Sequence, residues 1–413
     1  MKIAFVSIFP PHRDGIADYS FFLVEAMREV CSDCFFYIIA PTLDHNIEGI
    51  RLNEQVHLLR IWNMSSFKRA LRSIISIIKI VVATKVDVLH IQYRFTREQG
   101  GSVGEPFLVL ILILRKAMKR VRIVVSLHDF WLPSQVEKRA HEITKSRTLA
   151  RLYRIYYIAY VRLMLSAPNL IFSIVNVRGS LTTELIKKYA KSEVVETLHG
   201  LPDIGSIDMD KRTKYKGIVG GDGKFTILLF GFIRKDKGYE YVLRAIRKII
   251  ESSPSMKETI RVMLVGAPIF PEDKVYLGYL EKLVDDLDLR SITLVIPKYL
   301  ENEEVNSFFG AADVTIISNT RRVGPSGVFS LALAYEVPSI ITSDGIYITH
   351  ESRIPALIVN LNTDEIASAI LGLMTNKHEY AQQLQKIRDY KAANSNQEIA
   401  FSHLRWYRKL LET

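Results

Sequence analysis

The chain has 413 residues and a formal net charge of +11, and 48% of its residues are hydrophobic and 24% charged. This composition is that of a globular protein, and the length favours two domains over a single core. No run of about 20 apolar residues is present, so we expect no membrane-spanning helix. The N-terminus does not follow the pattern of a signal peptide, and we expect a cytoplasmic protein.

The excess positive charge lies in the first half of the chain. Residues 1–200 hold 28 Lys and Arg against 17 Asp and Glu, whereas residues 201–413 hold 27 of each. The first half is therefore expected to meet something acidic. Three basic stretches with helical periodicity, at 66–84, 106–122 and 146–165, suggest an anionic membrane at the inner face of the cell. For the first stretch, a core-facing helix with a basic outer face is the alternative. No nucleic-acid-binding motif is visible, so we expect no nucleic acid.

Strand and helix patterns alternate along the whole chain, which predicts an α/β protein with doubly wound parallel sheets. Predicted strands cover 2–9, 35–40, 86–92, 122–127, 170–174, 194–197, 226–230, 261–265, 291–296, 314–317, 339–342 and 357–360. Helices are predicted at the three basic stretches and at 16–30, 239–250, 276–287, 301–311, 328–335 and from 364 to the end. Residues 200–224 are poor in apolar runs. We therefore predict a first domain at 1–200, a linker at 201–224, a second domain at 225–385, and terminal helices at 386–413 that pack back on the first domain.

The loop between the predicted strand 314–317 and the helix 328–335 looks suited to an anion. It holds Arg321 and Arg322 and then Gly324, Pro325, Ser326 and Gly327 at the helix start. Glycines let backbone N–H groups approach a ligand, and a helix N-terminus favours negative charge. The pattern therefore predicts a phosphate site, which we interpret as the site for the pyrophosphate of a nucleotide-sugar. A plain turn with Ser326 as N-cap is the alternative.

Other phosphate and metal motifs are absent from the sequence. The segment 220–224 lacks the spacing of a P-loop, and no G-x-G-x-x-G fingerprint of a dinucleotide-binding enzyme occurs. Cys31 and Cys34 form a lone C-x-x-C, which is a poor zinc site, and we expect both to pack at the end of the first helix. No D-x-D motif follows a predicted strand, and the one from Asp208 to Asp210 falls in the predicted linker, so we expect no metal and no cofactor.

Several stretches together resemble the GT-B glycosyltransferases of family 4, the group 1 glycosyltransferases. In the second half these are L-F-G-F-I-R-K-D-K-G-Y-E-Y-V-L-R-A, V-M-L-V-G-A-P and A-A-D-V-T-I-I-S. In the first half the match is weaker and rests on P-P-H-R-D-G-I-A-D-Y-S, V-D-V-L-H-I-Q-Y and S-L-H-D. The resemblance implies a GT-B fold, in which two Rossmann-like domains face each other across a cleft. It also implies a UDP- or GDP-sugar donor in the second domain and an acceptor mostly in the first.

The same resemblance assigns roles to individual residues. It implies catalytic roles for His128, Arg234 and Lys237. It implies that the donor or its phosphates are bound by Gly15, Gly231, Gly324, Ser326, Gly327, Val328, Arg321 and Arg322. It implies that the acceptor is bound by Asp14, Tyr19 and Tyr93. The implied reaction moves a sugar to a glycan or lipid-linked acceptor with retention of anomeric configuration and without metal.

The chain departs from the family at two positions where most members carry glutamates. Aligning A-L-A-Y-E-V-P with the family pattern places Val323 and Leu331 there, and neither side chain can hydrogen-bond a hydroxyl. Phe232 also stands where many members have an arginine. The alternative hypothesis is therefore a catalytically degenerate GT-B protein that serves as a partner- or membrane-binding subunit.

Overall fold

The chain divides into two units, each built on its own sheet. Unit 1 comprises Met1–Gly200 and Asn396–Thr413, and unit 2 comprises Leu201–Ser395. The computed structural model describes residues 1–12, 14–43, 48–63, 66–94, 104–176, 178–202, 204, 209–300, 302–320, 325–343 and 354–413. Of the helices in these ranges, none is both long and apolar enough to cross a membrane.

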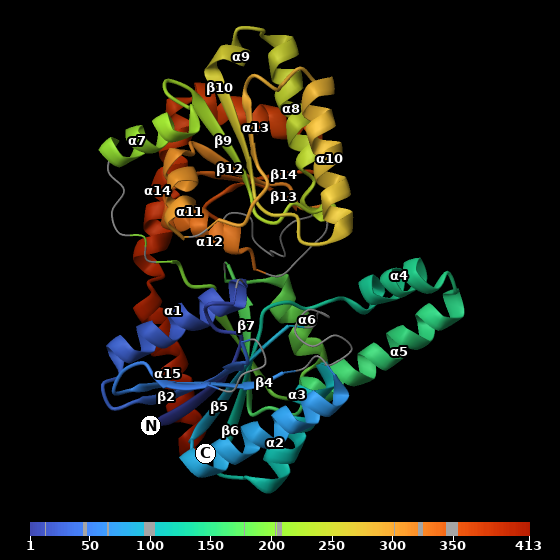
Figure 1. Cartoon of the computed structure of the whole chain (residues 1–413), viewed down its shortest axis with the longest axis vertical. Helices are drawn as coiled ribbons and strands as arrows, with labels where there is room; N and C mark the ends of the chain where they lie inside the picture. Colours follow the sequence, from blue (N-terminus) through green and yellow to red (C-terminus); the bar gives the residue numbers. More distant parts are fainter. Residues whose placement is uncertain are drawn as a thin grey trace. The chain divides into compact units, whose positions relative to one another are not determined.

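Unit 1 contains an eight-stranded sheet with the order β3-β4-β2-β1-β5-β6-β7-β8 (Figure 1). Only the pairing of β3 with β4 is antiparallel, and the other pairings of this sheet are parallel. The strands are β1 (Lys2–Val6), β2 (Phe35–Pro41), β3 (Glu48–Arg51), β4 (Val56–Trp62), β5 (Val88–Tyr93), β6 (Arg122–Leu127), β7 (Leu170–Val175) and β8 (Glu193–Leu198). The helices are α1 (Gly15–Val30), α2 (Phe67–Thr84), α3 (Gly104–Ala117), α4 (Pro133–Thr144), α5 (Arg147–Met164), α6 (Leu181–Tyr189) and α15 (Asn396–Glu412).

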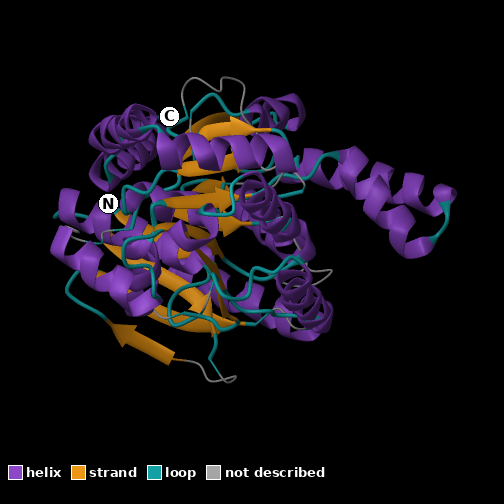
Figure 2. Ribbon diagram, turned by 90° about the horizontal axis from the view of Figure 1, so that it is seen from above, coloured by secondary structure: helices purple, strands orange, loops and turns teal. Residues whose placement is uncertain are grey.

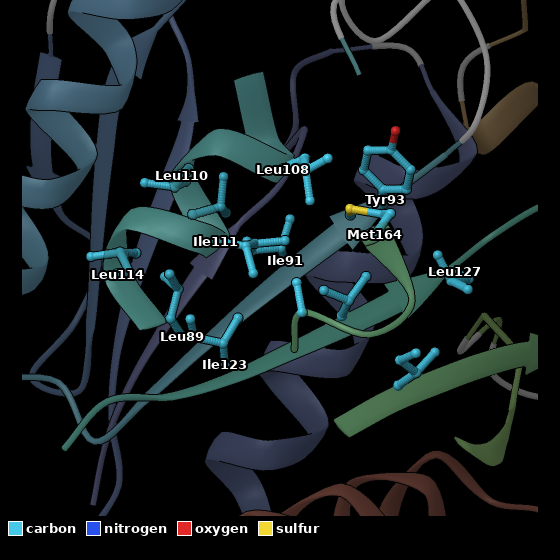
Figure 3. Close-up of a cluster of buried hydrophobic side chains, with 14 of the residues drawn as sticks. Leu89, Ile91, Tyr93, Leu108, Leu110, Ile111, Leu114, Ile123, Leu127 and Met164 are labelled. Carbon is cyan, nitrogen blue, oxygen red and sulfur yellow. The ribbon is translucent and has the colours of Figure 1, made fainter. Parts of the chain in front are cut away.

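The central strands of unit 1 are continuous apolar runs because helices cover both faces of a parallel sheet. Every residue of β5 and of β7 is buried. Figure 3 shows one of the two layers, in which Ile111 and Leu114 of α3 lie over Leu89 and Ile123 of the sheet. This packing fixes the ends of β5 and β6, from which the polar residues of unit 1 emerge.

The C-terminal helix α15 belongs to unit 1 and packs against α1. Tyr407 is fully buried, and its hydroxyl lies 2.5 Å from Nδ1 of His90 on β5. The predicted boundary at 386 falls inside a helix of unit 2, α14 (Lys377–Ala393), so only the residues from Asn396 on return to unit 1. Helical periodicity alone does not mark this boundary, because α14 and α15 are separated by only two residues.

Unit 2 contains a six-stranded parallel sheet with the order β11-β10-β9-β12-β13-β14. The strands are β9 (Phe225–Phe230), β10 (Ile260–Val265), β11 (Thr293–Ile296), β12 (Val314–Ile317), β13 (Ser339–Thr342) and β14 (Leu357–Val359). Besides α14 the helices are α7 (Met209–Val219), α8 (Tyr239–Ser252), α9 (Met256–Thr259), α10 (Pro271–Asp286), α11 (Asn302–Ala311), α12 (Gly327–Ala334) and α13 (Thr363–Thr375). The α/β class and the two Rossmann-like sheets predicted from the sequence are confirmed.

The segment predicted as a linker, 201–224, differs from the expectation because it contains α7 and belongs to unit 2. Only Val219 of this helix is buried, so apolar periodicity could not reveal it. Val219 and Tyr215 pack on the core of unit 2, and polar contacts also hold the helix. The Lys216 ammonium lies 2.7 Å from the Asp313 carboxylate, and the Arg212 guanidinium donates to the carbonyl of Tyr335 at 3.0 Å.

The two cysteines pack at the end of α1, as the sequence suggested. Cys31 is the C-cap residue of this helix, and both side chains are buried. Their sulfur atoms are joined in a disulfide, so neither sulfur is a thiolate available to bind a metal.

Candidate functional site

Two loops meet at the carboxyl edge of the unit 2 sheet, because β9 and β12 are neighbours there. The backbone N–H of Thr320, after β12, donates to the carbonyl of Asp236 at 2.9 Å. The Ser318 hydroxyl donates to the carbonyl of Lys237 at 2.8 Å. We call these contacts, between residues 236–238 and 318–320, the loop junction. It brings Arg234 and Lys237, which the sequence predicts as the cations of the site, to the same edge of the sheet as the start of the predicted phosphate loop.

Glycine is required where the two loops approach each other. Gly238 has a φ of +60°, and a Cβ there would overlap the carbonyl oxygen of Ser318 and lie 2.9 Å from Cγ2 of Thr320. Gly231 has a φ of +115°, and its Cβ would lie 3.4 Å from Cγ2 of Val328. The end of β9 therefore runs beside the first turn of α12, which a bulkier residue would push away.

The N-terminus of α12 lies one residue from the predicted start, and it has the capping serine of the alternative interpretation. Ser326 is the N-cap residue, and its hydroxyl accepts a hydrogen bond from the N–H of Phe329 at 3.2 Å. The N–H groups of Gly327 and Val328 belong to the first turn, where helical N–H groups have no carbonyl partner within their own helix. A Cβ at Gly327 would meet no heavy atom within 4 Å. Among the described residues, none therefore crowds the Cβ position of Gly327 at the helix start.

Arg234 is held by an acid of its own loop. Its Nε and Nη2 atoms donate to the two carboxylate oxygens of Asp236 at 3.0 and 2.7 Å. The Arg234 and Asp236 side chains are 27% and 15% exposed. This bidentate pair fixes the guanidinium plane and offsets part of its charge. Lys237 is half-buried in the same turn.

The remaining predicted residues of the phosphate loop, Arg321, Arg322 and Gly324, lie outside the described residues, as does Val323. Leu331, at the other position where the family carries a glutamate, is half-buried on α12. The ring of Phe232 lies 6.5 Å from the ring of Tyr299, measured between centroids.

A second polar cluster lies in unit 1, at the carboxyl ends of β5 and β6. His128 follows β6 and is 6% exposed, and its Nε2 lies 2.7 Å from Oε1 of Gln92 on β5. With that oxygen as the acceptor, His128 carries its proton on Nε2. Burial lowers the pKa of His128 well below its ordinary value, and the charge of Arg94 lowers it further. The imidazole is therefore neutral at physiological pH.

The start of α1 adjoins this cluster through its side chains. The ring of Tyr19 meets that of His128 edge-on, with centroids 4.9 Å apart. Asp14 caps the helix by accepting from the N–H of Ile16 at 2.8 Å, and its other oxygen lies 3.3 Å from Nη1 of Arg94. A Cβ at Gly15 would meet no heavy atom within 4 Å, so packing does not demand a glycine there.

Tyr93 is placed differently from the other predicted acceptor residues. It is 2% exposed and belongs to the hydrophobic core under α3 (Figure 3). Its hydroxyl is hydrogen-bonded to that of Tyr160 on α5. These contacts give Tyr93 a structural role, because they tie α5 to the sheet.

Three polar residues of these sites were not identified from the sequence: Gln92, Arg94 and Asp236. Gln92 and Arg94 flank Tyr93 at the end of β5, and such strand ends are where α/β proteins place ligand-binding residues. The Nε2 of Gln92 is buried and has no hydrogen-bond partner among the described residues. Asp236 stands two residues after Arg234, a spacing that could have suggested the ion pair.

A hollow in unit 2 lies at the opposite edge of its sheet and has a volume of about 1110 Å³. Phe225 at the start of β9 and Asp313 before β12 line it. Lys216 binds Asp313 there, and both Arg388 and Lys391 bind Glu336, while Arg212 and Lys377 add further positive charge. The hollow lies away from the edge that holds the loop junction, and none of the predicted site residues that the structure describes lines it.

Comparison with known proteins agrees with this picture. The family described as "Glycosyl transferases group 1" matches residues 224–376. No curated protein sequence matches the chain. Among solved structures, sucrose-phosphate synthase from Thermosynechococcus elongatus is similar with a TM-score of 0.72 at 15% identity, covering 100% of this chain and 99% of that one.

Two further solved structures show the same fold. HepE from Anabaena, in complex with UDP and glucose, has a TM-score of 0.68 at 14% identity and covers 99% of this chain and 100% of its own. A trehalose-6-phosphate protein from E. coli, bound with UDP-2-fluoro glucose, has a TM-score of 0.71 at 12% identity. The match covers 98% of this chain and 99% of that one.

The fold and the family match together define a GT-B protein. Its second unit is a group 1 glycosyl transferase domain, and the protein is accordingly a glycosyltransferase.

Proposed function

We propose that the protein transfers a sugar from a nucleotide-sugar to a glycan or lipid-linked acceptor. An acceptor hydroxyl oxygen bonds to the anomeric carbon, while the bond from that carbon to the diphosphate oxygen breaks. The hydroxyl proton leaves the acceptor, and the nucleoside diphosphate departs with the bonding electrons. Negative charge therefore builds on the diphosphate, and the site has to stabilise it there.

The loop junction is the observation that carries this proposal. It draws Arg234, Lys237 and the start of α12 to one edge of a group 1 domain. In our proposal the two cations and the N–H groups of Gly327 and Val328 bind the diphosphate, together with Arg321 and Arg322. These fixed charges take the place of a metal, so we expect transfer to be insensitive to chelators. Retention of configuration is proposed on the resemblance to the family alone.

Unit 1 is proposed to serve the sugar and the acceptor. A neutral His128, held by Gln92, can hydrogen-bond a sugar hydroxyl without adding charge near the anomeric carbon. Asp14 and Tyr19 are the proposed acceptor residues. Tyr93 is left out because its hydroxyl bonds to Tyr160.

A screen of UDP- and GDP-sugars by thermal unfolding tests the proposal without knowledge of the acceptor. The HepE and E. coli structures contain UDP or a UDP-sugar, so UDP-sugars come first. A ligand at 100 times its dissociation constant stabilises the folded state by about 2.7 kcal/mol, which is a readily measured shift. Stabilising donors then enter an assay of nucleoside diphosphate release with pooled glycan and lipid-linked acceptors.

The outcomes separate the two hypotheses. Stabilisation followed by acceptor-dependent release of diphosphate supports sugar transfer. Stabilisation without release from any acceptor favours the degenerate binding subunit. Failure of every nucleotide-sugar to shift the transition contradicts both the donor site and the proposed function.

A further inference from the structure

The helices α4 and α5 form an antiparallel hairpin that extends away from the body of unit 1 (Figures 1 and 2). Val136 and Ala140 of α4 are buried, as are Ala150, Tyr157 and Val161 of α5. The Arg154 guanidinium lies 2.9 Å from the Glu137 carboxylate and links the two helices. The hairpin is therefore a packed structure of its own rather than a loose insertion.

The base of the hairpin is fixed to the sheet. The Tyr157 hydroxyl donates to the carbonyl of Trp131 at 2.9 Å, and Tyr160 is hydrogen-bonded to Tyr93 at the end of β5. Arg115 of α3 donates to the carbonyl of Ser166 at 2.8 Å, just beyond the end of α5. These contacts hold α5 in a set orientation, so the outer face of the helix is presented in a defined direction.

That outer face is apolar and uncovered. Six large side chains of α5 are between 47% and 64% exposed: Leu149, Leu152, Tyr153, Ile155, Tyr156 and Leu163. Five of them follow the i, i+3, i+4, i+7 spacing of a single helical stripe, with Ile155 to one side. Contiguous apolar surface of this kind commonly marks an interaction site.

The charges on α5 are all of one sign. The helix has four arginines and no acid, and Arg147, Arg151 and Arg162 are exposed. Two other helices of unit 1 repeat the combination on their exposed residues. On α2 these are Leu71, Ile75 and Val82 with Lys68, Arg72 and Lys79, and on α3 they are Val109, Leu112 and Ile113 with Lys116.

We propose that α5 docks on an anionic phospholipid bilayer, with its apolar stripe in the interface and its arginines against the headgroups. Interfacial helices combine these two features, and tyrosine rings favour the headgroup level. A second copy of the chain fits less well, because a symmetric contact would set arginines against arginines with no acid on α5 to pair them. The docking is separate from sugar transfer and does not depend on it.

Sedimentation with vesicles tests the docking. One set contains phosphatidylcholine alone and the other adds phosphatidylglycerol, both at low salt. The full chain is expected to pellet with the anionic vesicles only. The variant Arg147→Gln/Arg151→Gln/Arg162→Gln should reduce its partition coefficient by roughly tenfold or more, since each basic residue near an anionic surface adds to binding. The variant Leu152→Ser/Tyr156→Ser should also lose binding, because the stripe no longer inserts.

A matched control removes three exposed lysines from unit 2 by Lys274→Gln/Lys282→Gln/Lys386→Gln. It loses the same charge and should pellet like the unaltered chain. All substituted side chains are exposed, and thermal unfolding confirms that each variant is folded. Equal pelleting with neutral and anionic vesicles would overturn the proposal, and so would hairpin variants that bind no worse than the control. If sedimentation velocity shows a dimer, and if Leu152→Ser/Tyr156→Ser dissociates that dimer, the apolar stripe would be the interface with a second copy of the chain instead.

Discussion

The backbone N–H of Thr320 donates to the carbonyl of Asp236 across 2.9 Å. The two residues are 84 positions apart, and this bond joins the loop after β9 to the loop after β12. On one side of it lie Arg234 and Lys237, and on the other the chain enters the predicted phosphate loop. The proposed donor site therefore depends on how closely these two loops approach.

Substitution of Gly238 by alanine should separate the loops. The added Cβ would overlap Ser318 and meet Thr320, and the positive φ adds strain. Gly223→Ala is a matched control, because Gly223 has a φ of +67° but no heavy atom within 4 Å of the Cβ position. We expect Gly238→Ala to lower the free energy of unfolding by about 2 kcal/mol more than the control does. Urea denaturation measures the difference. Equal losses of unfolding free energy in the two variants would show that residue 238 and the loop at Ser318 are not in tight contact.

Much of this architecture could be predicted from the sequence, because buried parallel strands are continuous apolar runs. The strands around Ile227 and Ile316 were predicted close to their observed places, and the N-cap at Ser326 was the alternative interpretation of its loop. The strand β4 (Val56–Trp62) was missed, although its residues alternate between buried and half-buried. The helix α7 was missed because only one of its residues, Val219, is buried, so the helix shows no apolar periodicity.

The sites were less predictable than the fold. Arg234 could be proposed from the resemblance to the family, but its pairing with Asp236 depends on side-chain geometry within a turn. Likewise His128 could be singled out, whereas Gln92 could not, since their contact joins residues 36 positions apart. Tyr93 was implied as an acceptor residue by the resemblance, whereas its side chain packs in the hydrophobic core and bonds to Tyr160.

Neutralising the cations of the turn should slow sugar transfer with little effect on stability. Removal of one group that stabilises developing charge costs about 10²–10³ in rate, so Arg234→Gln and Lys237→Gln are each expected to lower kcat by that order. Lys235→Gln is the control, because Lys235 lies in the same turn and is exposed. Kinetics of diphosphate release measure the effect. A comparable loss of kcat in all three variants would indicate a general effect of positive charge rather than specific binding of the diphosphate by Arg234 and Lys237.

Gly15 offers a way to separate function from packing. A Cβ there has open space, so Gly15→Ala should leave the free energy of unfolding unchanged or slightly raise it. We nevertheless expect weaker donor binding, because the resemblance to the family implies that the diphosphate approaches this residue. Gly278→Ala on α10 also adds a methyl group into open space, and it should not alter binding. Titrations of both variants with the donor measure this effect. An unaltered affinity of Gly15→Ala for the donor would show that Gly15 is not part of the donor site.

Unit 1 should lose stability in mild acid through a buried histidine of α15. Burial lowers the pKa of His403 to about 4, whereas the unfolded chain has the ordinary value of about 6.5. The unfolded state therefore binds the proton first, and stability falls as the pH drops from about 6.5 towards 4, by up to about 1.4 kcal/mol per pH unit. His403→Gln should reduce this slope in urea titrations, while the buried His128 continues to contribute to it. A slope unchanged by His403→Gln would contradict the assignment.

Calorimetric titration of the full chain with UDP and GDP tests the central claim most directly, because it asks whether unit 2 binds a nucleoside diphosphate at the loop junction. We predict saturable one-to-one binding of at least one of the two, weakened about tenfold or more by Lys237→Gln and unaffected by Lys235→Gln, as expected when one charge-assisted contact is lost. Absence of binding by both nucleotides, or equal binding by the two variants, would contradict the account.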